Sequence, residues 1–230
     1  MDAVNLAQDL AHPLSSILAQ SFLCYLHYCR GEQDLTRERA GAVMALCAEH
    51  EIAPQYLAAG RILQGWVLAV QGDTNEGLAE VRQGLVGFRS TGVTLHYVFL
   101  LAMLAELCGR AGELDRGLEA VAEAFEVAKE TGDQLWVAEI HRLKGGLLLA
   151  QSVEHWPQAE TCYAQALEVA RIRGAKSLEL RAATSLAMLW RDKGKRAQAR
   201  DLLAQAYGWF TEGFGTADLK RAKALLDELA

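Results

Sequence analysis

The sequence has little proline, few aromatic residues and no run of alternating β-branched and polar residues. Its 230 residues include three prolines, and aromatic residues make up 7% of the chain. Alanine, leucine, glutamate, glutamine and arginine, which favour helices, are abundant instead. Because strands need β-branched or aromatic alternation, these absences predict an all-α fold. The 51% of apolar residues is enough for a continuous core.

A positive net charge, a disulfide framework and a membrane-length apolar run are also absent. The net charge is −6, which disfavours binding to nucleic acid. The five cysteines are odd in number and fall within helical patterns, which favours a reducing cytoplasm. The start, "MDAVNLAQDL", is acidic and unlike a signal peptide. The most apolar run, "YVFLLAMLAELCG", is short and contains Glu106, so we expect no membrane span.

Two interleaved series of turns share one period. Gly92, Gly132, Gly174 and Gly215 are separated by 40, 42 and 41 residues. A second series lies midway, at "QGDTN", "AGELD" and "KGKRA". Two turn series with one period of this size are typical of stacked helix–turn–helix repeats. Glycine at these turns supplies the left-handed residue that ends a helix.

These turns predict one repeat domain over residues 1–230, an α-α superhelix of about five helical hairpins. The expected parts are a half repeat at 1–11, hairpins at 14–50, 54–91, 95–131, 134–173 and 176–211, and a capping helix at 216–229.

Small residues recur twelve positions apart across the turn inside a hairpin. Gly65 pairs in this way with Gly77, and Ala187 with Ala199. Small side chains let two antiparallel helices approach closely, and we expect Val81 and Leu203 to fill the space beside them.

This spacing resembles the tetratricopeptide repeat (TPR), in a long form of about forty residues. Segments such as "GWVLAVQGDTNEGLAEVRQGLVGFRSTG" and "AKSLELRAATSLAMLWRDKGKRAQARDLL" resemble, more specifically, the C-terminal repeat region of large bacterial signalling proteins. Those proteins join a nucleotide-cyclase or kinase domain to a predicted ATPase and then to such repeats. The resemblance implies a regulatory or interaction segment without catalytic residues. The first repeat departs from the pattern, since "GEQDLTRERA" is longer and Tyr28 stands where a small residue is expected.

The sequence predicts an uncapped repeat at the N-terminal end and a capped one at the C-terminal end. Residues 2–11 look like the second helix of a repeat whose first helix is missing, so we expect either a fragment or self-association through the uncapped edge. At the other end, "GWFTEGFGTADLKRAKALLDELA" contains Thr216 at an N-cap position. After it, one helical stripe consists of Leu219, Ala222, Leu226 and Leu229. "GFGTAD" lacks the third glycine of a phosphate loop, so we expect a structural cap.

No catalytic or metal-binding constellation stands out. Cys24, His27 and Cys29 suggest a metal site, but on one helix Cys29 falls roughly 160° from His27, so one ion could not bind all three. We interpret the cysteines as core residues. Serine-nucleophile and zinc-protease motifs are missing. We therefore predict no enzyme activity and no cofactor.

What remains is a surface, because the first helices of such hairpins line the concave face. Projecting residues expected there are Arg61, Trp66, Tyr97, Glu106, Arg110, Glu139, Arg142, Arg181 and Arg191. Aromatic and arginine side chains are typical of binding hot spots, and the arginines could pair with an acidic peptide. An ordinary solvated face with pairs such as Glu106–Arg110 explains the pattern equally well.

We therefore predict a non-enzymatic protein-interaction module of a bacterial signalling protein. Its partner would be a protein or peptide, including an upstream domain of the same polypeptide. The alternatives are a sensor that binds a small molecule on the concave face and a self-assembling scaffold.

Overall fold

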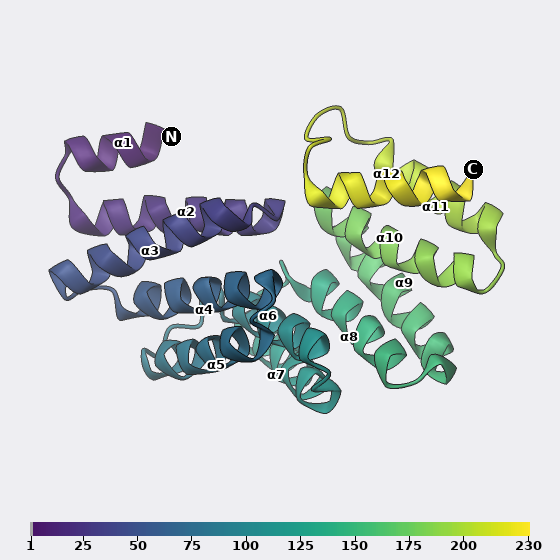
Figure 1. The fold of residues 1–230 in the computed structure, drawn as a ribbon, viewed down its shortest axis with the longest axis horizontal. Helices are drawn as coiled ribbons and strands as arrows, with labels where there is room; N and C mark the ends of the chain where they lie inside the picture. Colours follow the sequence, from purple (N-terminus) through teal and green to yellow (C-terminus); the bar gives the residue numbers. More distant parts are fainter. Residues whose placement is uncertain (1) are drawn as a thin grey trace. The chain divides into compact units, whose positions relative to one another are not determined.

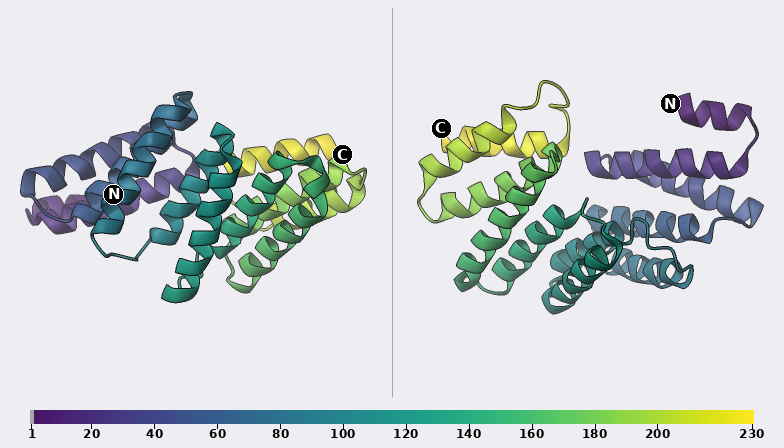
Figure 2. Two further views of the ribbon diagram at one scale, coloured as in Figure 1. Left: turned by 90° about the horizontal axis from the view of Figure 1, so that it is seen from below. Right: turned by 180° about the vertical axis from the view of Figure 1, so that it is seen from behind.

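The computed structural model describes residues 2–230, and every regular element in this range is helical (Figure 1). The predicted all-α class is therefore confirmed. The chain divides into two compact units, Met1–Ala111 (unit 1) and Gly112–Ala230 (unit 2). Figure 2 shows an up-and-down succession of helices in each of them.

Unit 1 consists of helices that each pack on the next helix along the chain. They are α1 (Asp2–Asp9), α2 (Pro13–Arg30), α3 (Gln33–His50), α4 (Pro54–Gln71), α5 (Thr74–Ser90) and α6 (Tyr97–Ala111). In addition α2 packs on α4, and α4 packs on α6, so the first helices of successive pairs form one layer. Pro13 and Pro54 stand at the start of their helices, where the missing N–H is harmless.

The backbone conformation at the turns of unit 1 shows why its helices end where they do. Gly31 ends α2 with a φ of 73°, and Gly72 ends α4 with a φ of 121°, both in the region that favours glycine. The turn between α3 and α4 has no glycine. There Glu51 and Ala53 adopt φ values of 52° and 56°, which is unfavourable for residues with a side chain.

The predicted close approach of α4 and α5 is present. A methyl group added to Gly65 would lie 2.7 Å from the carbonyl oxygen of Gly77. One added to Gly84 would lie 2.5 Å from Cγ1 of Ile62. Val81 is fully buried beside these glycines, as the spacing predicts.

Unit 2 continues with the same kind of packing. Its elements are α7 (Leu114–Thr131), α8 (Val137–Gln151), the short η1 (Val153–His155), α9 (Trp156–Ile172), α10 (Lys176–Asp192), α11 (Arg196–Tyr207) and α12 (Ala217–Leu229). The layer of first helices here is α8, α10 and α12, each packed on the next. Ala187 and Ala199 are fully buried where α10 meets α11, and Leu203 is buried beside them.

The C-terminal helix α12 packs on α10 and α11 (Figure 1). Thr216 is its N-cap residue, but the hydroxyl donates to the carbonyl oxygen of Gly213 at 2.8 Å instead of accepting from a helix N–H. Leu225 is buried in this helix, whereas Leu226, which the expected stripe contained, is half-buried. The buried stripe of α12 therefore passes through Leu225, one residue before the position that the spacing predicts.

None of the helices in the described range is long and apolar enough to cross a membrane.

Candidate functional site

Six aromatic side chains gather on the first-helix layer of unit 1. They come from α2, α4 and α6 and the residue just before α6, and we call them the aromatic cluster: Phe22, Tyr25, Tyr28, Trp66, His96 and Phe99. On α2 the members are three residues apart, which places them along one face of the helix. Because α4 lies between α2 and α6, these rings cover its face.

Apart from the tilted pair of Tyr25 and His96, the rings meet edge to face, a geometry that aromatic pairs prefer. The Tyr28 ring lies 4.7 Å from that of Trp66 and 5.1 Å from that of Phe99. The Tyr25 ring lies 5.3 Å from that of Phe99. Aromatic side chains from α2 therefore reach across α4 to α6 and tie the layer together.

The cluster has a buried end and an exposed end. Trp66 is 6% exposed, and its indole Nε1 is buried without a hydrogen-bond partner among the described residues. Phe22 is 57% exposed, and Leu26 on the same helix is 48% exposed. The exposed end is thus an apolar surface beside rings that are already fixed in place by their neighbours.

Five of the residues proposed from the sequence as a groove lie in unit 1, and they have different surroundings. Trp66 is in the buried part of the cluster. Tyr97 is buried too, stacked on Phe88 of α5. Arg61 makes a bidentate contact with Glu80 of α5, at 2.6 Å and 3.4 Å.

Glu106 and Arg110 form an i,i+4 ion pair at 3.2 Å on α6. The Tyr28 hydroxyl donates to the other oxygen of Glu106 at 3.4 Å. This polar pair therefore borders the aromatic cluster.

The other four lie in unit 2, on its first-helix layer. Glu139 of α8 is 6% exposed and accepts two hydrogen bonds from Arg142, at 2.9 Å and 2.7 Å. Arg181 of α10 lies 3.6 Å from Glu139 and donates to Asp218 of α12 at 2.7 Å. One guanidinium thus links carboxylates from the two neighbouring helices.

Burial raises the pKa of the Glu139 carboxyl, but the charges of Arg142 and Arg181 and the Arg142 hydrogen bonds outweigh it and hold the pKa at about 2. Arg191 pairs with its neighbour Asp192 and with Glu228 of α12. The arginines proposed as groove residues in unit 2 therefore all contact carboxylates of the chain itself. As binding residues, the nine positions stay a proposal.

Sequence reasoning missed most of the aromatic cluster. Of its members, only Trp66 was among the expected groove residues. The signal was present in the spacing of Phe22, Tyr25 and Tyr28, which repeat every three residues.

Two of the residues that suggested a metal site, Cys24 and His27, make other contacts in the structure. The Cys24 thiol is buried and contacts the carbonyl oxygen of Thr36 at 3.3 Å, and burial raises its pKa to about 12. His27 bonds to Glu32 at 2.6 Å. Within residues 2–230, no three His, Cys, Asp or Glu side chains are grouped so that they could hold a metal ion.

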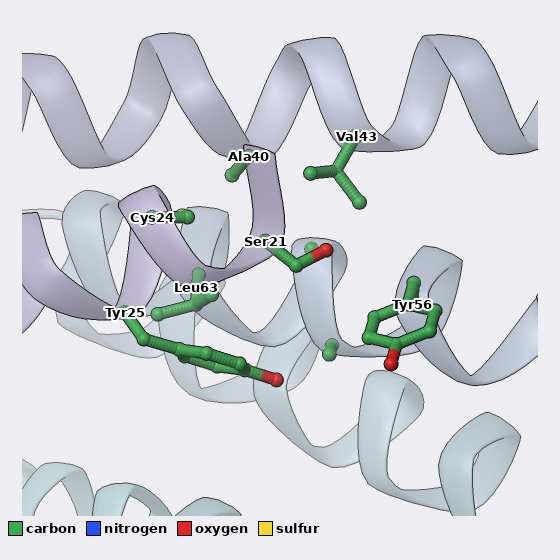
Figure 3. Close-up of a pocket in the computed structure, with 9 residues that line it drawn as sticks. Ser21, Cys24, Tyr25, Ala40, Val43, Tyr56 and Leu63 are labelled. Carbon is green, nitrogen blue, oxygen red and sulfur yellow. The ribbon is translucent and has the colours of Figure 1, made fainter. Parts of the chain in front are cut away.

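Cys24 also borders a hollow between α2, α3 and α4 (Figure 3). Ala40 and Val43 point towards it from α3, and the rings of Tyr25 and Tyr56 lie at its edge. The hollow leaves no space for a water molecule. It is therefore part of the core of unit 1.

The order of the helices and their packing define a TPR-like helical-repeat domain, and solved structures of this kind are similar to the chain. PlcR of Bacillus thuringiensis, in complex with the peptide PapR7 and DNA, matches with a TM-score of 0.73 and 10% identity, over 93% of this chain and 74% of that one. A Rap protein complexed with competence and sporulation factor matches with a TM-score of 0.72 and 13% identity, over 99% of this chain and 61% of that one.

A putative kinesin light chain of Podospora anserina with nearly identical TPR-like repeats matches with a TM-score of 0.56 and 16% identity, over 86% of this chain and 95% of that one. An uncharacterized protein of Rhizobium meliloti (strain 1021) is 28% identical over 186 residues. That match covers 80% of this chain but 17% of the relative, so the chain spans about a sixth of the length of that protein. No protein-family model matches the chain.

Proposed function

We propose that this chain is a non-catalytic module that binds a protein or peptide on the first-helix layer of unit 1, at the exposed end of the aromatic cluster. The observation that carries the proposal is the exposure of Phe22 and Leu26 next to rings that are held by their neighbours. Binding hot spots are enriched in aromatic residues and lie where the surface is well packed. Two structurally similar proteins support this function, since PlcR is in complex with the peptide PapR7 and the Rap protein with competence and sporulation factor.

The surface favours a peptide segment with an apolar, preferably aromatic, side chain. Such a side chain would cover Phe22 and Leu26 and contact the edges of Tyr25 and His96. The Glu106–Arg110 pair on α6 offers a charged acceptor and a charged donor for the polar groups of the same segment.

We also propose that the chain is the regulatory repeat region of a longer bacterial signalling protein. The match to a segment of a much longer Rhizobium protein supports this context. In that case an upstream domain of the same polypeptide is one source of the bound segment.

A selection from a random peptide library tests the binding site directly. We expect enriched peptides with apolar anchors that bind the parent chain and lose at least tenfold in affinity with a Phe22→Ser/Leu26→Ser variant, since truncated hot-spot residues cost more than about 1.4 kcal/mol. Val86→Ser is the matched control, because Val86 is 72% exposed on α5, outside the first-helix layer.

Circular dichroism melting should show that both variants fold like the parent chain. If no peptide is enriched, or if Val86→Ser weakens binding as much as the double variant, the aromatic cluster is not the binding site.

A further inference from the structure

Unit 2 contains a cavity of about 450 Å³ that is widely open to solvent and that none of the predicted groove residues lines. Its walls come from α7, the turn after it and α8, through Phe125, Ala128, Lys129, Gln134, Val137 and His141. Its volume lies within the usual range of small-molecule sites, about 300–1,000 Å³. It therefore differs from the hollow of unit 1, which has no room for water.

The cavity lies on a different side of α8 from the buried ion pairs. His141 and Glu139 are two residues apart, which places them about 160° apart around the helix. A molecule in the cavity would therefore leave the contacts of Glu139 with Arg142 and Arg181 intact. The site is also independent of the aromatic cluster, all of which lies in unit 1.

One wall of the cavity is apolar. Phe125 presents its ring, with Ala128 and Val137 beside it. The His141 ring lies 4.7 Å from that of Phe125, tilted by 58°. A flat apolar ligand of one or two rings would bury its surface against this wall, because aromatic rings pack well on one another.

The charged groups of the cavity are cationic. Lys129 lines it, and Lys144, which is outside the lining, has its Nζ 6.0 Å from the centre of the Phe125 ring. No carboxylate is among the residues that line it. Neither lysine forms an ion pair with the carboxylates in residues 2–230. An anionic group would gain from both charges.

His141 adds a polar group to the α8 wall, and because its Nδ1 is shielded from solvent, a ligand in the cavity would meet Nε2. Its Nδ1 is buried and makes no hydrogen bond with the described residues, which is costly for a polar group. Burial, and then the charge of Lys144, lowers the pKa of the imidazole below its ordinary value of 6.5. The ring is therefore neutral at pH 7, so one nitrogen can donate a hydrogen bond and the other can accept one.

We propose that this cavity binds a small planar aromatic carboxylate, with the ring against Phe125, the carboxylate facing Lys129 and Lys144, and a hydrogen bond to His141. An aromatic acid has both a flat apolar ring, which suits the wall formed by Phe125, and a negative charge, which suits the lysines. A carboxylate on a saturated ring matches the charge but not the plane, and a neutral amide matches the plane but not the charge.

Isothermal titration calorimetry on the whole chain at pH 7 tests the site with benzoate, salicylate and indole-3-acetate. We expect millimolar or tighter binding of at least one acid, and binding of benzamide and cyclohexanecarboxylate that is weaker by about tenfold. Lys129→Gln and Lys144→Gln should each weaken binding of the acid by roughly fivefold to tenfold. Lys220→Gln, an exposed lysine on α12, is the control and should change nothing.

The imidazole of His141 gives a second measurement, by ¹⁵N NMR of the same titration. Its ring nitrogens should shift saturably with the acid, and His141→Phe, which keeps a ring in place, should weaken binding. The proposal is overturned if none of the three acids binds saturably, if benzamide binds as well as benzoate, or if Lys220→Gln loses as much affinity as Lys129→Gln.

Discussion

Gly77 lies so close to Gly65 that a methyl group on its Cα would stand 2.3 Å from the Gly65 carbonyl oxygen. The same methyl group would be 2.6 Å from the backbone nitrogen of Ala69. Both of these neighbours are backbone atoms of α4, which cannot turn aside as a side chain can. The contact therefore fixes the distance between α4 and α5.

Gly77→Ala should lower the free energy of unfolding by about 1–3 kcal/mol, the range for an overfilled core, because α4 and α5 would have to separate. Gly87→Ala in the same helix is the control. A methyl group there would be 3.7 Å from Cβ of Ala58, an ordinary contact, so we expect a gain of about 0.5–1 kcal/mol from helix propensity. Urea unfolding followed by circular dichroism measures both. Equal effects of the two substitutions would contradict this account.

Trp66→Phe should lower the free energy of unfolding by less than Trp190→Phe does. The indole N–H of Trp66 is buried without an acceptor among residues 2–230 that the structure describes, so its removal takes away an unsatisfied group. Trp190 is the comparison, because its Nε1 donates to the Glu160 carboxylate. Hydrogen bonds to charged groups contribute about 1.5–3 kcal/mol, so Trp190→Phe should be more destabilising than Trp66→Phe by roughly 1 kcal/mol or more. Thermal and urea unfolding of the two variants measure which substitution is more destabilising.

Glu139→Gln should destabilise unit 2 by about 3 kcal/mol. The substitution keeps the shape of the side chain but removes the charge that neutralises Arg142 and, together with Asp218, Arg181, and breaking a buried ion pair is costly. Glu126→Gln on the exposed side of α7 is the control, with an expected change within about 0.5 kcal/mol. If the two variants unfold at the same urea concentration, the ion pairs of Glu139 do not stabilise the fold.

Glu139 also makes stability depend on acidity. Its pKa is about 2 in the folded chain against an ordinary 4.5, so its contribution is complete above pH 4.5 and is lost as the pH falls from 4.5 towards 2. Linkage sets this loss at ~3 kcal/mol. Urea unfolding of the parent chain at a series of pH values should show the loss, and Glu139→Gln should show less of it. A parallel decline in the two proteins would assign the acid sensitivity to other carboxylates.

The architecture could be predicted from the sequence because its signals are local. Gly72 and Gly132 end helices with left-handed φ values, and such turns mark the repeat directly. The pairing of Gly65 with Gly77 follows from a spacing of twelve residues across a single turn. Each of these inferences needs only residues that are near one another in the chain.

The surfaces were harder to predict, because they depend on contacts between helices of different repeats. Arg181 looks like a free cation on its helix, but it meets Glu139 and Asp218, which are about forty residues away in either direction. Tyr28 and Phe99 meet across α4, and helical periodicity does not show which rings will touch. A spacing rule gives the face on which a side chain lies but not the partner that it finds there.

The order of packing within each unit has a consequence for how quickly the chain folds. In both units the helices pack on those one or two places along the sequence. Few long loops must then be closed before contacts form, and proteins with such local contacts fold fast, on the microsecond to millisecond scale. A nucleus can start at any helical pair and grow outward to its neighbours. Stopped-flow refolding should therefore show a main phase that is complete within milliseconds.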